Sequence, residues 1–341
     1  MTLALIFLLV PALYTQNLLA QNLLAPKWVA QDSGVTASLR GVHAVSSEIV
    51  WASGADGTWL RTLNGVARWD SGTVNGGEKL DFRGLYAFSA TDAVVMSSGE
   101  GSASKVFATT DGGAHWTLLF ENPEAKGFFD GIAFRDRLNG ALLGDPVSGH
   151  FTVFVTADGG KTWIRREGPV ANEGEASFAA SNSTLWVGGK GEIRIASGGK
   201  GGARIFRSAD NGKSWKAIQT PVRHDVETAG IFSLGWRDSR HGIVVGGNYR
   251  KDQEAAANIA MTSDGGKTWV TVKSGPAGFR SAVAYLANYR LWLATGTSGS
   301  DTALDSKVWV KFDDGEYNAV SGVWGVGPKG RIAKFLAAPR R

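Results

Sequence analysis

The chain has 341 residues, a length that suggests about two average domains but that a single large all-β domain also reaches. It contains 46 Gly and 13 Trp but no Cys, which predicts a folded chain rich in tight turns and excludes disulfides, thiolate metal sites and a Cys nucleophile. Its 36 Lys and Arg residues outnumber the 31 Asp and Glu residues, yet they are scattered along the chain, which argues against nucleic-acid binding because that function needs a clustered basic face.

The first 25 residues carry no charged side chain and include an apolar run from Leu3 to Leu13. A run of that length suits the hydrophobic region of a signal peptide and is short for a membrane span. The segment lacks the basic residues that usually begin a signal peptide, which counts against this interpretation. We predict a signal peptide over residues 1–25 and export to the periplasm or the cell exterior.

One eight-residue pattern, Ser/Thr-x-Asp-x-Gly-x-x-Trp, recurs four times along the chain. The Asp and Trp residues of the four copies are Asp111 and Trp116, Asp158 and Trp163, Asp210 and Trp215, and Asp264 and Trp269. Ser/Thr and Asp side chains can hydrogen-bond the backbone of a tight turn, Gly can adopt a positive φ, and Trp can pack between neighbouring sheets. Because regular spacing places each copy in the same kind of turn, we predict that these Asp residues are structural and not a catalytic carboxylate pair.

Weaker copies of the pattern end at Trp69 and Trp309. The six Trp residues are therefore 47, 47, 52, 54 and 40 residues apart, which is the period of a four-stranded propeller blade. Between the copies, apolar segments joined by polar turns predict pairs of strands. Six blades then account for residues from about Leu39 to Trp309.

The segment from Tyr317 to Phe335 repeats the first strands of a blade but lacks the pattern that would precede an outer strand. A strand around Trp28 to Asp32 can supply that outer strand and close the ring without open sheet edges. We therefore predict an all-β fold, a seven-bladed β-propeller of four-stranded antiparallel blades that forms one domain over residues 26–338.

These repeats resemble the Asp-box, or bacterial neuraminidase repeat, propellers, and within them the photosystem II stability/assembly factor-like group. TADGGKTW (156–163) and TSDGGKTW (262–269) are typical of Asp-box repeats, while GALLGDP (140–146) and GIVVGGNY (242–249) are similar to strings of that group. The resemblance covers nearly the whole chain after residue 25. It implies a seven-bladed scaffold without established catalysis that helps a membrane complex to assemble, and such proteins also occur in non-photosynthetic bacteria.

The starts of the innermost strands should share the rim opposite the Asp turns and face the mouth of the channel. The polar residues at these starts are Arg40, Arg83, Asp130, Ser177, Ser233, Arg280 and Asn318. Because a planar guanidinium suits two-point recognition of a carboxylate, we predict that the three Arg residues converge there and bind an anionic group. Asp130 would offset part of their repulsion.

Loops on the same rim add further candidate binding residues. They are Asp145, Tyr249, Arg250, Ser298 and Asp301. Two long segments, 188–202 and 248–258, are expected to be recognition loops, since propellers usually place recognition in long loops on one rim.

The sequence favours a non-enzymatic interaction or assembly scaffold over an enzyme. It contains no recognisable acid–base or nucleophile constellation, no HExxH motif, and a GxGxxG string at 325–330 that joins two strands instead of a strand and a helix. We predict no catalytic residues, no metal and no cofactor, and a monomer whose partner is a protein, such as a membrane complex, or an acidic ligand or carbohydrate. The alternative is a sialidase-like or other glycoside hydrolase, although the Phe-Arg-Ile-Pro signature of sialidases is missing.

Overall fold

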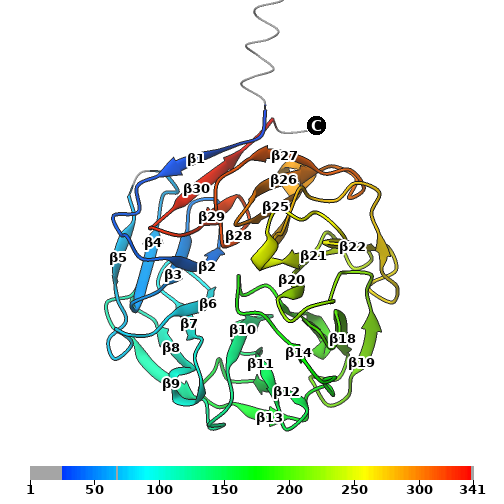
Figure 1. The fold of residues 1–341 in the computed structure, drawn as a ribbon. Helices are drawn as coiled ribbons and strands as arrows, with labels where there is room; N and C mark the ends of the chain where they lie inside the picture. Colours follow the sequence, from blue (N-terminus) through cyan, green and yellow to red (C-terminus); the bar gives the residue numbers. More distant parts are fainter. Residues whose placement is uncertain (1–24, 67, 339–341) are drawn as a thin grey trace, which may run out of the picture.

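The computed structural model describes residues 25–66 and 68–338, which form a closed ring of seven antiparallel sheets (Figure 1). Each sheet is one blade of a β-propeller, so the predicted all-β, seven-bladed fold is confirmed. The predicted signal peptide lies outside the described residues apart from residue 25. No helix in the described part of the chain is long and apolar enough to cross a membrane.

The first three blades each contain four strands that follow one another from the centre of the ring outward. Blade one consists of β2 (Leu39–Ala44), β3 (Val50–Gly54), β4 (Thr58–Thr62) and β5 (Asp70–Thr73). Blade two consists of β6 (Phe82–Ala87), β7 (Ala93–Ser97), β8 (Lys105–Thr109) and β9 (Thr117–Glu121), with the 3-10 turn η1 (Gly101–Ala103). Blade three consists of β10 (Phe129–Phe134), β11 (Gly140–Val147), β12 (His150–Thr156) and β13 (Ile164–Arg166).

The next three blades keep this order, but two additional strands precede and interrupt blade four. Blade four consists of β15 (Leu185–Val187), β16 (Ile193–Ala196), β18 (Arg204–Ser208) and β19 (Lys216–Gln219), with η2 (Gly189–Gly191). Blade five consists of β20 (Ala229–Trp236), β21 (Gly242–Asn248), β22 (Ile259–Thr262) and β23 (Val270–Thr271), with η3 (Tyr249–Lys251). Blade six consists of β24 (Ala282–Leu286), β25 (Leu291–Gly296), β26 (Gly299–Ala303) and β27 (Val310–Asp313), with η4 (Ala287–Tyr289).

Blade seven joins the two ends of the chain. It consists of β28 (Ala319–Ser321), β29 (Trp324–Val326), β30 (Ile332–Leu336) and, on the outside, β1 (Lys27–Gln31). β1 pairs antiparallel with β30, and Trp28 lies opposite Phe335. The Trp28 indole also donates a hydrogen bond to Ser300 Oγ of blade six, at 2.9 Å. The predicted closure of the ring by the N-terminal strand is therefore confirmed.

Each complete copy of the repeated pattern closes the turn between the third and fourth strands of a blade. In the copy of blade three, Thr156 Oγ1 donates to Asp158 Oδ1 at 2.8 Å and accepts from Gly160 N at 2.9 Å. Asp158 also accepts hydrogen bonds from the side chain and backbone of Thr162, which hold its pKa at about 2. Gly160 has φ of +88°, a conformation that favours glycine. Asp111, Asp210 and Asp264 make the corresponding contacts.

The Trp that ends each pattern packs into the interface with the preceding blade. Trp116 of blade two lies in a buried cluster with Trp51 and Trp59 of blade one. Trp69 meets Trp324 of blade seven edge-on, with ring centres 5.5 Å apart. Packing of this kind links the sheets around the whole ring, because each blade buries apolar side chains against its neighbour.

Residues 177–184, the central segment, depart from the repeat and cross the centre of the ring (Figure 1, green). Asn182 Nδ2 donates to the Leu85 and Ile132 carbonyls of blades two and three, at 3.1 and 3.0 Å. Ser181 Oγ donates to the Ser281 carbonyl beside blade six, at 2.7 Å. The segment therefore ties together blades that are not neighbours.

Two expectations for blade four are wrong as a result. Ser177 does not begin its innermost strand, because β15 starts eight residues later, at Leu185. The segment 188–202 is not one long loop, because it contains β16 and the short strand β17 (Gly198–Gly199). β17 pairs with β14 (Glu175–Ala176) and with the inner edge of β20, so both short strands extend blade five.

Candidate functional site

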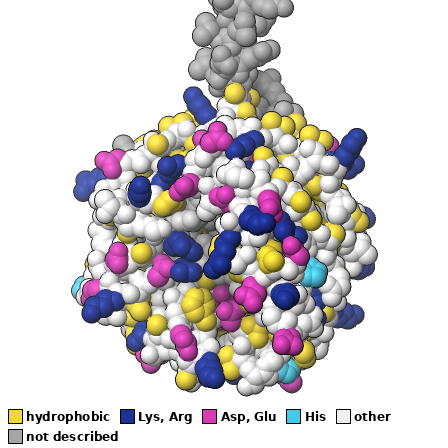
Figure 2. All heavy atoms as spheres, viewed as in Figure 1, with side chains coloured by type: hydrophobic (Ala, Val, Ile, Leu, Met, Phe, Trp, Pro, Cys, Tyr) yellow, Lys and Arg dark blue, Asp and Glu magenta, His cyan; other side chains and the backbone are white. Residues whose placement is uncertain are grey.

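A cavity of about 410 Å³, the mouth cavity, lies where the innermost strands begin. It is lined by Arg40, Arg83, Phe178, Ala179, Ala180, Phe232, Tyr249, Phe279, Ser281, Thr297 and Asn318. These residues come from five blades and from the central segment. Figure 2 shows the face of the ring seen in Figure 1, where Lys and Arg side chains gather around the centre with Asp and Glu side chains among them.

Arg40 and Arg83 stand side by side on blades one and two. Burial and the nearby charge of Arg83 lower the pKa of Arg40, while Asp81 opposes that change. Arg83 Nε donates to Asp81 Oδ2 at 2.7 Å, and Arg40 Nη2 donates a long hydrogen bond to the Ala179 carbonyl at 3.4 Å. Arg40 Nε is buried without a partner among the described residues. Two neighbouring cations with free donor capacity favour binding of an anion.

β-bulges place these side chains at the mouth cavity. In blades one, two, three and five, one residue near the start of the innermost strand is left out of the ladder. These residues are Arg40, Arg83, Asp130 and Phe232. A bulge re-aims the side chain of the unpaired residue, which explains why the same position in blades one, two and five lines the cavity, whereas Asp130 of blade three does not line it.

In blade five, the residue that the bulge directs to the cavity is therefore one position earlier in the sequence than predicted. Its bulged residue is Phe232, and the predicted Ser233 lies back in the ladder opposite Val245. The Ser233 hydroxyl instead accepts hydrogen bonds from Ser183 Oγ and Val283 N. A shift of one residue along a strand reverses the face of the sheet, so Ser233 serves contacts within the ring.

One wall of the mouth cavity is aromatic, which sequence reasoning missed. The rings of Phe178 and Phe232 stack in parallel with centres 3.9 Å apart, and Phe279 meets Phe232 edge-on at 4.7 Å. Tyr249, 44% exposed, extends this wall at the rim. Phe precedes the predicted polar residue in blades two, three, five and six, but only the Phe residues of blades five and six line the cavity, so this sequence pattern is a weak signal of the wall. The cavity therefore offers cations on one side and an apolar surface on the other.

Asp130 and Asp145 of blade three are neighbouring carboxyl groups near Arg83. Asp130 is 1% exposed, and burial together with the charge of Asp145 raises its pKa far above the usual value, against a lowering effect of Arg83. Burial likewise raises the pKa of Asp145 to about 6, although its Oδ1 accepts a hydrogen bond from Ser177 N at 3.0 Å. Neither carboxyl group lines the mouth cavity.

Replacing Asp145 by Asn should stabilise the protein at neutral pH. Its carboxyl pKa rises from 3.8 to about 6 on folding, so the unfolded chain ionises first and stability is lost as pH rises from about 4 to about 6. Asn keeps the acceptor for Ser177 N but carries no charge. Since one pKa unit corresponds to roughly 1.4 kcal/mol, we expect a gain of up to about 3 kcal/mol at pH 7.5 and none at pH 4.

Urea unfolding of wild type and Asp145→Asn at a series of pH values measures this effect. Comparing the two proteins at each pH cancels the contributions of the titrating groups that do not interact with Asp145; Asp130, whose pKa the charge of Asp145 helps to raise, is the exception. A difference between them that did not grow between pH 4 and pH 7 would contradict the assignment.

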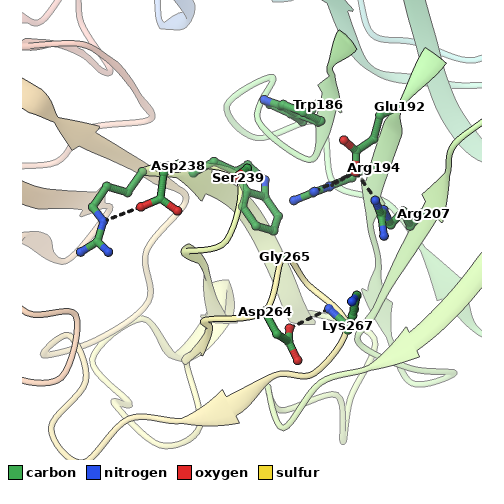
Figure 3. Close-up of a pocket in the computed structure, with 11 residues that line it drawn as sticks. Trp186, Glu192, Arg194, Arg207, Asp238, Ser239, Asp264, Gly265 and Lys267 are labelled. Carbon is green, nitrogen blue, oxygen red and sulfur yellow. Dashed lines mark hydrogen bonds and ion pairs between the residues drawn. The ribbon is translucent and has the colours of Figure 1, made fainter. Parts of the chain in front are cut away.

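A second hollow, of about 580 Å³, lies between blades four and five at the rim of the Asp turns (Figure 3). Its lining includes Trp186, Arg194 and Trp236 as well as turn residues such as Asp264. None of the predicted binding residues belongs to it. Because the strands run between the two rims, this hollow and the mouth cavity lie at opposite ends of the blades.

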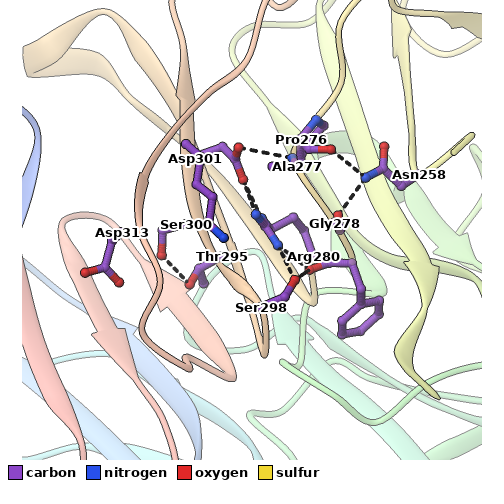
Figure 4. Close-up of polar contacts among 12 residues, drawn as sticks. Asn258, Pro276, Ala277, Gly278, Arg280, Thr295, Ser298, Ser300, Asp301 and Asp313 are labelled. Carbon is purple, nitrogen blue, oxygen red and sulfur yellow. Dashed lines mark hydrogen bonds and ion pairs between the residues drawn. The ribbon is translucent and has the colours of Figure 1, made fainter. Parts of the chain in front are cut away.

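Arg280 does not reach the mouth cavity, contrary to the expectation (Figure 4). Its side chain is fully buried, and its Nε donates to Asp301 Oδ2 at 2.6 Å. Its Nη1 donates to Ser298 Oγ at 2.9 Å. Arg280 takes the place in blade six that the buried Leu39 takes in blade one. The Cα atoms of both residues pack against a glycine of the second strand, Gly296 for Arg280 and Gly54 for Leu39, so Arg280 occupies a core position. The next residue, Ser281, takes the place at the cavity.

The remaining predicted residues divide between the rim and the interior. Asn318 and Tyr249 line the mouth cavity as expected. Arg250 is exposed in η3 and does not line it. Ser298 and Asp301 are buried partners of Arg280. Among residues 25–66 and 68–338, no group of three or more His, Asp and Glu side chains could hold a metal ion.

Comparison with known proteins identifies the fold. No protein-family model matches the chain, and no curated protein matches it. A solved structure described as YCF48 bound to D1 peptide is 16% identical, with a TM-score of 0.64 over 91% of this chain and 97% of that chain. YCF48 from Cyanidioschyzon merolae is 15% identical, with a TM-score of 0.60 over 90% and 98%.

An enzyme shares the scaffold as well. The GH74 xyloglucanase from Xanthomonas campestris is 14% identical, with a TM-score of 0.59 over 91% of this chain. This chain spans 53% of the length of that enzyme. At such low identities the likeness shows a common propeller fold, and fold alone does not select a function.

Proposed function

We propose that this protein is an exported interaction propeller of the Asp-box type, which holds an anionic segment of a partner protein in the mouth cavity. The observation that carries the proposal is the pairing of Arg40 and Arg83 opposite the aromatic wall of Phe178, Phe232 and Phe279. A carboxylate would bind the guanidinium groups, and a neighbouring apolar side chain would pack on the rings.

Two further findings support this function. The repulsion between Arg40 and Arg83 costs stability in the free protein and would be relieved by an anion, because opposite charge favours the ionised form of both groups. YCF48, whose structure was solved with a D1 peptide, has the same fold. By analogy, the partner would be a protein that is being assembled into a membrane complex.

Replacing both Arg40 and Arg83 by Ala should weaken binding of an acidic peptide while leaving the fold intact. The probe is a short labelled peptide with Glu and Phe next to a free C-terminal carboxylate, measured by fluorescence anisotropy. We expect a loss of roughly tenfold or more in affinity at low salt and a smaller loss at high salt, since screening weakens charge contacts. The melting temperature should stay unchanged or rise.

A double variant of Lys161 and Lys213 to Ala is the matched control, because it removes the same charge from exposed positions on the rim of the Asp turns. It should bind the peptide like wild type. Equal losses in the two double variants would mean that net charge, and not the arginine pair, determines binding. An unchanged affinity in the arginine variant would overturn the proposal.

Glycoside hydrolysis is the alternative function, and the raised pKa of Asp145 is the feature that favours it. The buried position of Asp130 and the absence of both carboxyl groups from the cavity lining count against it. Incubation with sialyllactose and with xyloglucan should release no sugar above a control without protein. Sugar release that is abolished by Asp145→Asn would establish the enzyme.

A further inference from the structure

Blade four carries a charged residue at a position that is apolar in the other blades compared with it. The position is the second residue of the second strand, which pairs with the second-to-last residue of the first strand. In blades one, two, three, five and six it holds Trp51, Val94, Ala141, Ile243 and Trp292, all of them buried. In blade four it holds Arg194, which is 4% exposed. A buried cation in an apolar blade interface requires a specific reason.

The contacts of Arg194 satisfy only part of its guanidinium. Its Nε and Nη2 donate to Glu192 Oε1 at 3.0 and 2.7 Å, and Arg207 Nε donates to the same oxygen at 2.8 Å. The guanidinium carbon lies 3.5 Å from the ring centre of Trp236 and 5.0 Å from that of Trp186. Within residues 25–66 and 68–338, Arg194 Nη1 finds no hydrogen-bond partner.

These side chains line the hollow between blades four and five, the inter-blade pocket. Figure 3 shows Arg194 reaching from Glu192 toward the middle of the hollow, with Trp186 beside it. The Trp236 indole N–H is a second buried donor without a partner among the described residues. An unsatisfied buried donor costs free energy that an acceptor from a ligand can recover.

Among the described residues neither donor has an acceptor, and the carboxylates of the pocket are held by other donors. Asp264 accepts hydrogen bonds from Thr268 in its own turn, and Asp238 accepts from Arg237 and His241. Glu192 is shared by two arginines, whose hydrogen bonds outweigh burial and lower its pKa. What remains open is a set of donors between two indole rings, a combination that fits a carboxylate attached to a sugar or aromatic ring that can pack against an indole.

We propose that the inter-blade pocket binds a small organic carboxylate whose ring packs beside Trp186 and Trp236. The carboxylate accepts hydrogen bonds from Arg194 Nη1 and the Trp236 indole. Both donor atoms are buried at the floor of the pocket, so the half-buried Trp236 side chain moves aside when the ligand enters. The site is independent of the mouth cavity, because it lies at the opposite rim and shares no lining residue with it.

Isothermal titration with two acids and their neutral amides tests the proposal. The probes are D-glucuronate against D-glucuronamide and benzoate against benzamide, so that one pair carries a sugar ring and the other an aromatic ring. At least one acid should bind roughly tenfold or more tightly than its amide, since charge-assisted hydrogen bonds are lost in the amide. A preference confined to one pair identifies the class of acid. Equal binding of acid and amide in both pairs, or no binding of any probe, overturns the proposal.

Two variants locate the binding. Arg194→Met should fold, because five other blades hold apolar residues at this position, and it should lose the preference for the acid. Trp236→Phe keeps an aromatic ring but removes the indole N–H together with the second ring of the indole, and it should weaken acid binding. The Arg40 and Arg83 double variant should bind the acid like wild type. Acid binding that survives in both Arg194→Met and Trp236→Phe, or that disappears in the Arg40 and Arg83 variant, contradicts the assignment.

Discussion

Replacing Arg280 by Ala should destabilise the protein by about 3 to 5 kcal/mol, the range observed when one partner of a buried ion pair is removed. Arg280 and Asp301 are both fully buried, and the guanidinium also donates to the Phe279 carbonyl at 2.7 Å. Without Arg280, the hydrogen bond that the described residues still give to the Asp301 carboxylate is the one from Ala277 N, at 3.2 Å. Urea unfolding measures the loss.

The matched variant replaces the pair as a whole. Arg280→Met combined with Asp301→Leu removes both charges, and most of the stability should return because an apolar pair needs no compensation. Neither residue lines the mouth cavity, so the folded fraction of Arg280→Ala should still bind the acidic peptide. A variant that unfolds like wild type but no longer binds the peptide would show that Arg280 belongs to the binding site after all.

Replacing Trp116 by Ala should also cost about 3 to 5 kcal/mol, as expected for truncation of a buried aromatic side chain. Trp116 is 8% exposed and packs edge-on against Trp51 of blade one, with ring centres 6.3 Å apart. Its removal would leave a cavity in the interface between blades one and two, where Trp59 is a further neighbour.

Trp215 supplies a control at the same place in the repeated pattern. It is only half-buried, and its indole donates to the Glu167 carbonyl at 3.1 Å. Trp215→Ala should therefore lose clearly less stability than Trp116→Ala, since the cost follows the apolar surface that becomes unburied. Denaturant unfolding of the two variants under identical conditions gives the comparison. Equal losses would mean that the motif, and not the burial of each ring, determines the contribution.

The position of the residues at the mouth cavity could be predicted only in part. Arg40 and Arg83 lie at the mouth cavity as expected, because both blades begin their innermost strand with the same bulge. The predicted positions in blades five and six, Ser233 and Arg280, are each wrong by one residue. The local sequence, Phe followed by a polar residue, is alike in blades two, five and six, so it does not reveal where the ladder shifts.

The inter-blade pocket could not be found from the sequence either. Arg194 belongs to a segment rich in Gly and Lys that resembles a loop, and its significance appears only when strand register aligns it with apolar residues of other blades. Its neighbour Trp236 comes from blade five, 42 residues later in the sequence. A pair of that kind is created by the packing of two blades and leaves no local pattern.

The sequence by itself determined the seven blades, their four-stranded build, the turns closed by Ser/Thr and Asp, and the closure of the ring by the N-terminal strand. These features depend on spacing and on contacts within a few residues, which a repeat displays directly. Only the tertiary structure decided that residues 177–184 cross the ring, that Arg280 is buried against Asp301, and that Arg194 lies between two indole rings. Those outcomes depend on which blades meet and on the register of each strand to within one residue. Both are set by packing across the whole ring.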